Sequence, residues 1–197
     1  MDKQVDFYWD LGSTNAYFAI KLLKPLAAKY NARITWHPFN LGHVFQSNNY
    51  VLMEEPRAKL ANRRDDLMRW AKKYDLHFTV PTTFPIKTSR ALRGAIAMRK
   101  WDKEVEFIEE IFAAYWERGD GTIGEYAALC DIASSLGVDA DEFKAESESP
   151  PVREALIDST NNALERGVFG VPSIMIGKEL YWGKDRMEFV EDQLAGR

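Results

Sequence analysis

The chain has 197 residues, enough for one generous domain or for a core domain that carries an insertion. Apolar residues make up 46% of the chain and aromatic residues 13%, so a well-formed hydrophobic core is available. The net charge is −4, the pI is about 5.5, and no run of Lys or Arg is longer than two. Phosphate binding needs a concentrated basic surface, so we do not expect nucleic acid as a partner.

No apolar run approaches the ~20 residues that cross a bilayer, and the first residues lack the apolar stretch of a secretory leader. The single cysteine, Cys130, rules out an internal disulfide and suits a reducing compartment. We therefore expect a cytoplasmic protein with no membrane partner. Cys130 lies in an apolar helical pattern, where a buried small side chain is favoured over a reactive thiol.

The first predicted element is a hydrophobic strand over residues 5–10, followed by a turn that ends at Ser13. A helix over about residues 14–30 is predicted next, and Pro25 is expected to kink or break it. Residues 33–38 alternate as a second strand. Two strands separated by one helix form a βαβ unit, which predicts parallel pairing.

From about Glu54 to Arg166 the apolar spacing predicts a series of helices. Thr88 or Ser89 is expected to cap one of them, and Gly137 to end another in the left-handed conformation. Strands return only at residues 173–176 and 179–182, joined by a two-residue loop. A terminal helix over about residues 185–194 completes the chain.

The predicted fold is a discontinuous α/β domain, residues 1–50 and 167–197, interrupted by an all-helical insertion at residues 51–166. A strand, a helix N-terminus and a late Val171-Pro172 before a hairpin follow one another in the order of a thioredoxin-like fold. We therefore expect Pro172 to be cis, with the backbone of Val171 open to a cleft between the two parts.

Ser13 is the central candidate for chemistry. Redox members of the thioredoxin fold carry Cys-x-x-Cys where this chain has Ser13 to Ala16, and a hydroxyl cannot exchange disulfides. A serine before a helix is usually an N-cap. The same position also suits a thiolate from another molecule, because a helix N-terminus offers N–H donors and the positive end of a dipole. The two roles are compatible.

Asp185-Arg186 is a second candidate, either as a capping Asp with a solvated Arg or as a site for a ligand that carries both an amine and a carboxylate. The three histidines, His37, His43 and His77, lack the spacing of a metal site. His43 falls in a predicted loop and is a candidate cleft residue.

Several blocks of the chain resemble the 2-hydroxychromene-2-carboxylate isomerases, a glutathione-dependent family related to kappa-class glutathione transferases and to DsbA. They occur in the family's order and span nearly the whole chain, and the last of them is the most specific. The blocks are residues 7–17, 38–42, 66–71, 84–85 with 90–93, 167–172 and 182–186.

The resemblance implies a glutathione site. In the family, the serine that matches Ser13 holds the glutathione thiolate. The residue before the cis-proline, Val171 before Pro172, pairs with the cysteinyl backbone. The region that matches Asp185 and Arg186 binds the γ-glutamyl end.

The resemblance also implies one more glutathione-binding residue and a residue on the substrate side. Lys59 matches a lysine that meets a carboxylate of glutathione or of the substrate, and Asn49 falls near a substrate-side asparagine. The chain departs from the family at Thr14-Asn15, where Ser-Pro is common, at Lys87 in place of an asparagine, and at Asn62 in place of a tyrosine. These changes surround the presumed substrate pocket.

The implied function is a glutathione-dependent isomerase acting on a small aromatic carboxylate, in which the bound thiolate adds reversibly to a conjugated acid. Two alternatives stay open. One is a kappa-like transferase or peroxidase, which consumes glutathione. The other is a non-catalytic thioredoxin-like binding module, since the fold alone does not decide function. Dimers are common among relatives of this fold, so a homodimer is a further expectation.

Overall fold

A four-stranded sheet forms the centre of the computed structural model, which describes residues 3–51 and 54–197. The strand order is β2-β1-β3-β4. The first two strands pair in parallel, and the other neighbouring pairs are antiparallel. The predicted βαβ unit and the late hairpin are thereby confirmed. The strands are β1 (Lys3–Trp9), β2 (Ala32–Pro38), β3 (Ser173–Ile176) and β4 (Glu179–Trp182).

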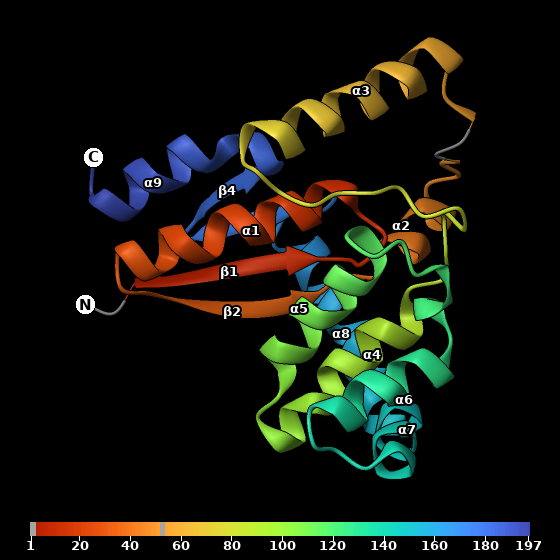
Figure 1. Cartoon of the computed structure of the whole chain (residues 1–197). Coiled ribbons are helices and arrows are strands. Elements are labelled where there is room, and N and C mark those ends of the chain that lie inside the picture. The colour runs from red at the N-terminus through yellow and green to blue at the C-terminus, as the bar shows by residue number, and fades with distance from the viewer. Residues whose placement is uncertain (1–2, 52–53) are drawn as a thin grey trace.

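Helices α1 (Thr14–Lys29) and α9 (Met187–Ala195) lie above the sheet in Figure 1. Of the kink or break predicted at Pro25, the break is absent, since α1 continues to Lys29. Proline removes only one hydrogen bond of the helix. Burial of one helix face, including Leu23 and Ala27 on either side of the proline, keeps the helix in place.

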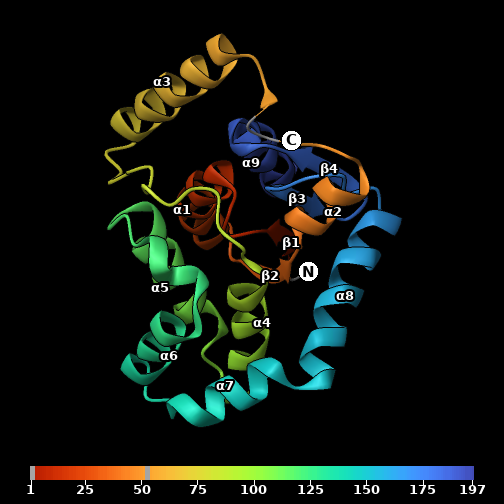
Figure 2. The same cartoon turned by 90° about the vertical axis from the view of Figure 1, so that its right-hand side faces the viewer.

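The predicted helical region follows β2. Figure 2 shows α5, α6, α7 and α8 arranged around α4. One hydrophobic cluster runs from the sheet into these helices, and the rings of Trp9 and Phe112 are 5.6 Å apart where they meet. The predicted boundaries at residues 51 and 166 stay a prediction. The helices are α4 (Ser89–Ala97), α5 (Glu104–Trp116), α6 (Tyr126–Ser135), α7 (Ala140–Glu148) and α8 (Pro150–Glu165), with 3-10 turns η2 (Met98–Trp101) and η3 (Gly121–Gly124).

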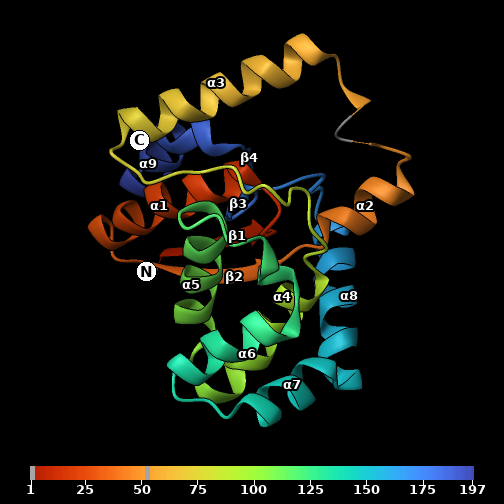
Figure 3. The same ribbon diagram turned by 45° about the vertical axis from the view of Figure 1, so that its right-hand side comes forward.

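Helix α3 (Arg57–Lys73) runs over α1 and α9, away from α6 and α7 (Figure 3). A shorter helix, α2 (Leu41–Ser47), was not predicted, so His43 lies in a helix and not in a loop. The Asn40 side chain starts α2 by accepting a hydrogen bond from the His43 N–H at 3.2 Å.

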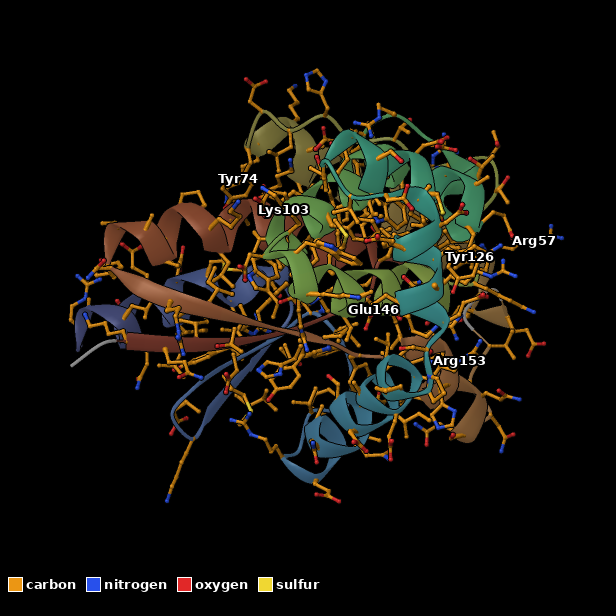
Figure 4. The ribbon with its side chains drawn as sticks, turned by 90° about the horizontal axis from the view of Figure 1, so that it is seen from below. Arg57, Tyr74, Lys103, Tyr126, Glu146 and Arg153 are labelled. Atoms are coloured by element: carbon orange, nitrogen blue, oxygen red, sulfur yellow. The ribbon has the colours of Figure 1, made fainter. Side chains whose placement is uncertain are left out.

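The 3-10 turn η4 (Lys184–Arg186) separates β4 from α9, so Asp185 precedes the terminal helix. On the underside of the molecule, Lys103, Glu146 and Arg153 come from the start of α5, from α7 and from α8 (Figure 4). Lys103 pairs here with Glu106 at 3.1 Å and Lys100 with Glu146 at 2.9 Å, while Arg153 donates to the Glu148 carbonyl. Among the described residues, no helix combines the length and the apolarity that a membrane span requires.

Gly94 tests how tightly the helical layer is packed. A β-carbon there would lie 3.0 Å from Cζ of both Phe107 and Phe143. We expect Gly94→Ala to lower the free energy of unfolding by about 1–3 kcal/mol, because overpacking exceeds the gain in helix propensity. Denaturant unfolding measures the change.

Gly42→Ala in α2 is the matched control. Its β-carbon would meet only Asn40 Oδ1 at 3.7 Å, an ordinary contact. The free energy of unfolding of this variant should stay unchanged or rise by up to ~1 kcal/mol. Equal effects of the two substitutions would contradict tight packing at Gly94.

Candidate active site

The turn between β1 and α1 places Ser13, which is 8% exposed. Its Oγ accepts a hydrogen bond from the Ala16 N–H at 3.2 Å and donates one to the Val171 carbonyl, also at 3.2 Å. The predicted N-cap is confirmed. The second bond joins residues 158 positions apart, so this serine links the two ends of the α/β part.

Val171-Pro172 forms the opposite side of this contact. The peptide bond is cis, as predicted. The Val171 side chain is buried and its carbonyl is engaged by Ser13, so the open backbone that we predicted is realised only in part. Within residues 3–51 and 54–197, nothing accepts a hydrogen bond from the Val171 N–H. The role of this donor in ligand binding stays a prediction.

The turn that carries Asp185 and Arg186 is tied to the cis-proline. The Gly183 N–H donates to the Pro172 carbonyl at 2.9 Å. Gly183 has φ +110°, a conformation that favours glycine, and a β-carbon there would also force the Asp185 carboxylate to move, because Oδ1 would lie 2.5 Å away. Asp185 and Arg186 are exposed and form an ion pair at 2.8 Å.

The first turn of α1 carries no acidic side chain, so no residue of the helix itself offsets the positive end of its dipole. A helix end of this kind, with a hydroxyl beside it, stabilises an anion and lowers the pKa of a thiol bound there.

The residues predicted for the substrate side are not joined to Ser13 by any contact among the described residues. Lys59 is exposed on α3 and pairs with Glu55 at 2.9 Å. His43 and Asn49 are exposed on and after α2, and Asn49 has φ +53°. Their roles stay predictions.

Glu55 collects several partners near the start of α3. Lys59 and the Tyr50 hydroxyl contact one carboxylate oxygen at 2.9 and 2.8 Å, and Arg63 pairs with the other. Hydrogen bonds, first from Lys59 and then from Tyr50, lower the pKa of Glu55 to about 2. The lysine that the resemblance assigns to a carboxylate therefore already binds one.

A family profile described as DSBA-like thioredoxin domain matches residues 4–195. The chain belongs to the DSBA-like thioredoxin family. It is 30% identical to a 2-hydroxychromene-2-carboxylate isomerase of Pseudomonas sp. (strain C18), over 98% of this chain and 90% of that protein. It is 26% identical to glutathione s-transferase kappa 2 of Caenorhabditis elegans, over 98% of this chain and 92% of that protein.

A solved structure of 2-hydroxychromene-2-carboxylate isomerase superposes with a TM-score of 0.86 at 28% identity, covering 98% of this chain and 95% of that chain. The thioredoxin-like fold and the family resemblance predicted from the motifs are thereby confirmed. Both sequence relatives have enzyme names, and the one with the higher identity to this chain is named an isomerase.

The sequence did not reveal the residues that form hydrogen bonds to the turn between β1 and α1. Trp116 of α5 donates its Nε1–H to the Leu11 carbonyl at 2.8 Å. Asp10 accepts the Gly12 N–H at 2.8 Å. Thr88 heads α4 as predicted, but its hydroxyl bonds to Asp10 and makes no capping bond. An acidic residue at the end of a buried strand, directly before the turn, was the available signal.

Lys184 was also missed, because lysine is rarely buried. It is 9% exposed, with Nζ 4.5 Å from the centre of the Trp70 ring and 3.7 Å from Asp66 Oδ2. Burial lowers the pKa of this amine, and the nearby carboxylates oppose that shift. Lys184 thus attaches α3 to the turn that carries Asp185.

The Trp116 bond to the turn is testable by replacing the indole with a phenyl ring. We expect Trp116→Phe to leave the buried Leu11 carbonyl unpaired, at a cost of roughly 1–3 kcal/mol beyond the loss of ring volume. Chemical denaturation gives the free energy of unfolding.

Trp9→Phe is the matched control, since both indoles are fully buried and Trp9 Nε1 has no hydrogen-bond partner among the described residues. The two variants lose the same atoms but only one loses a bond. Equal destabilisation would show that the Trp116 bond does not support the turn.

Proposed function

We propose that this chain is a glutathione-dependent isomerase of the 2-hydroxychromene-2-carboxylate isomerase type, acting on a planar, conjugated aromatic acid. The observation that carries the proposal is the position of Ser13 Oγ, at the N-terminus of α1 and 3.2 Å from the carbonyl that precedes the cis-proline. The name of the Pseudomonas relative, at 30% identity over nearly the full length, supports the reaction type.

The residues present fit glutathione. The Ser13 hydroxyl and the N-terminus of α1 suit a thiolate. The free Val171 N–H suits the backbone of a short peptide, in the manner of an added strand. Asp185 and Arg186 suit the amine and the carboxylate of a γ-glutamyl group.

Ser13 has one hydroxyl proton, which now points to the Val171 carbonyl at 3.2 Å. That distance is at the long end for an O–H···O bond, so redirecting the proton costs little. A bound thiolate would receive the proton in a charge-assisted bond, while Oγ continues to accept from Ala16 N–H.

Bound glutathione supplies a nucleophilic thiolate that adds to the unsaturated acid and leaves again, so that it is not consumed. Ser13 and the helix end keep that sulfur ionised before addition and accept it again after elimination. On the substrate side, we place the acid's carboxylate near Lys59, with Asn49 and His43 as further contacts.

We also propose that the protein works in the cytoplasm, where a reducing environment suits a glutathione site and a single free cysteine.

A kappa-like transferase or peroxidase is the second candidate, favoured by the similarity to glutathione s-transferase kappa 2. The same thiolate would then end in a product or in a disulfide. The free thiol concentration during turnover separates the two functions, because an isomerase leaves it constant.

Ser13→Ala tests the centre of the site. Glutathione should still bind through Val171 and Asp185, but its thiol pKa in the complex should rise. Turnover of a hydroxychromene carboxylate should fall by ~10²-fold, near the lower end for losing one preorganised donor to an anion, because thiolates accept hydrogen bonds less strongly than oxyanions. The thiolate absorbance of bound glutathione, followed against pH, measures the shift.

Ser149→Ala is the control, because Ser149 is also an N-cap serine, whose Oγ accepts from the Val152 N–H at 3.4 Å at the start of α8. Both variants should lose about 1 kcal/mol of stability from the lost cap. Only Ser13→Ala should change the thiol pKa. Identical titration and turnover in wild type and Ser13→Ala would reduce Ser13 to an N-cap.

Asp185→Asn tests the γ-glutamyl contact. A charged hydrogen bond contributes roughly 1.5–3 kcal/mol, so the dissociation constant for glutathione should rise about tenfold or more. Stability should hardly change, because Asp185 is exposed. Calorimetric titration gives the constant, with Glu188→Gln in the first turn of α9 as the matched control. Unchanged affinity with a large fall in Tm would make Asp185 a structural residue only.

A further inference from the structure

Asp10 is the one fully buried carboxylate at the candidate site, with 1% of its surface exposed. Its Oδ1 accepts the Gly12 N–H at 2.8 Å. Its Oδ2 accepts the Leu41 N–H at 2.9 Å and the Thr88 hydroxyl at 3.2 Å. One carboxylate therefore bonds to the turn before Ser13, to the first residue of α2 and to the residue that heads α4.

No cation balances this carboxylate. Among the described residues, no Lys, Arg or His forms an ion pair with Asp10, although Asp6, in the strand that directly precedes it, pairs with both Arg166 and His37. Burial raises the pKa of Asp10, and the bonds from Gly12, Leu41 and Thr88 oppose that shift. A buried acid without a counter-ion costs stability, so its presence here calls for a role beyond packing.

The three bonds need both oxygens of a carboxylate. The N–H groups of Gly12 and Leu41 each meet a different oxygen of Asp10, and the Leu41 N–H is shared with the Phe39 carbonyl, which also lies 2.9 Å away. An amide side chain offers only one acceptor oxygen, so asparagine cannot serve both. The packing leaves no slack, because a β-carbon at Gly12 would lie 3.3 Å from Thr88 Cγ2 and 3.4 Å from Asp10 Oδ1.

We propose that Asp10 is a positioning residue that fixes the Ser13 turn relative to the starts of α2 and α4. In naming the thiolate as the group that this geometry serves, the inference rests on the proposed function. Ser13 comes directly after Gly12, and its N–H bonds to the Asp10 carbonyl at 3.1 Å. Release of Gly12 therefore moves the hydroxyl, and a misplacement of about 1 Å costs up to ~10² in rate.

Asp10→Asn, Ser13→Ala and the double variant form the test. We expect Asp10→Asn to lower turnover roughly ten- to a hundredfold and to raise the thiol pKa of bound glutathione. If Asp10 acts through Ser13, the double variant should match Ser13→Ala within about twofold. Losses that multiply would overturn the proposal, because they would show two independent effects.

Asp6→Asn is the matched control. It is the same substitution four residues earlier, in β1, at a carboxylate that bonds to Arg166 at 2.9 Å and to His37 at 3.1 Å, and no contact joins it to Ser13 among the described residues. It should lower stability without changing the thiol pKa. An equal rise in thiol pKa for both variants would overturn the proposal, since the rise would then not depend on the bonds that Asp10 makes to the Ser13 turn.

Thr88 provides a milder pair of variants in case Asp10→Asn does not fold. Thr88→Val removes only the hydroxyl donor to Asp10, and Thr88→Ser restores it. Turnover should fall several-fold in Thr88→Val and recover in Thr88→Ser. Two variants indistinguishable from wild type would count against the role of this carboxylate.

Amide hydrogen exchange of the ligand-free protein separates this inference from the proposed function. Residues 11–17 and 40–44 should exchange faster in Asp10→Asn than in Asp6→Asn, whether or not glutathione binds. If wild type does not bind glutathione but the two variants still differ in exchange, the proposed function is wrong and Asp10 still positions the Ser13 turn. Unchanged exchange in both segments would show that Asp10 does not position the Ser13 turn.

Discussion

The hydrogen bond from Ser13 to the Val171 carbonyl closes the α/β part of the molecule at the place where its chemistry is expected. The partners lie 158 residues apart, and the carbonyl that precedes the cis-proline meets the N-cap residue of α1. Everything else at the site is arranged around this contact. Trp116 from α5 holds the Leu11 carbonyl, and Gly183 ties the Asp185 turn to Pro172.

The helical region is therefore part of the site and not an appendage. Thr88 and Trp116, which both come from it, bond to consecutive parts of the Asp10–Ser13 segment. Because the hydrophobic core is also continuous across this junction, displacing α4 or α5 would disturb the serine. A turn held from several elements loses little entropy when a ligand binds, which is the physical content of preorganisation.

The strands and most helices could be predicted because their signals are local, whereas α2 was not predicted and the cis Pro172 was predicted from its place in the order of a thioredoxin-like fold. Alternation marks a strand, Gly137 and Gly167 end helices with positive φ, and the Gly177-Lys178 loop fits a tight hairpin. The support of Ser13 could not be predicted, since the bond from Thr88 to Asp10 spans 78 residues. Thr88 looks like an ordinary helix cap in the sequence, and only the tertiary fold shows that its hydroxyl is engaged elsewhere.

The residues proposed for the substrate side differ from Ser13 and its neighbours in their exposure to solvent. Ser13, Val171 and Asp10 are buried and fixed, whereas Lys59, His43 and Asn49 are exposed and lie on or beside α2 and α3. If Lys59 meets a ligand carboxylate, that carboxylate competes with Glu55, which already binds Lys59 and Arg63. Glu55 keeps its charge down to low pH because these partners hold its pKa near 2, so protonation does not release Lys59 under physiological conditions. The ligand must therefore gain more from Lys59 than Glu55 loses, and this requirement favours acids that also bind through their ring over simple carboxylates.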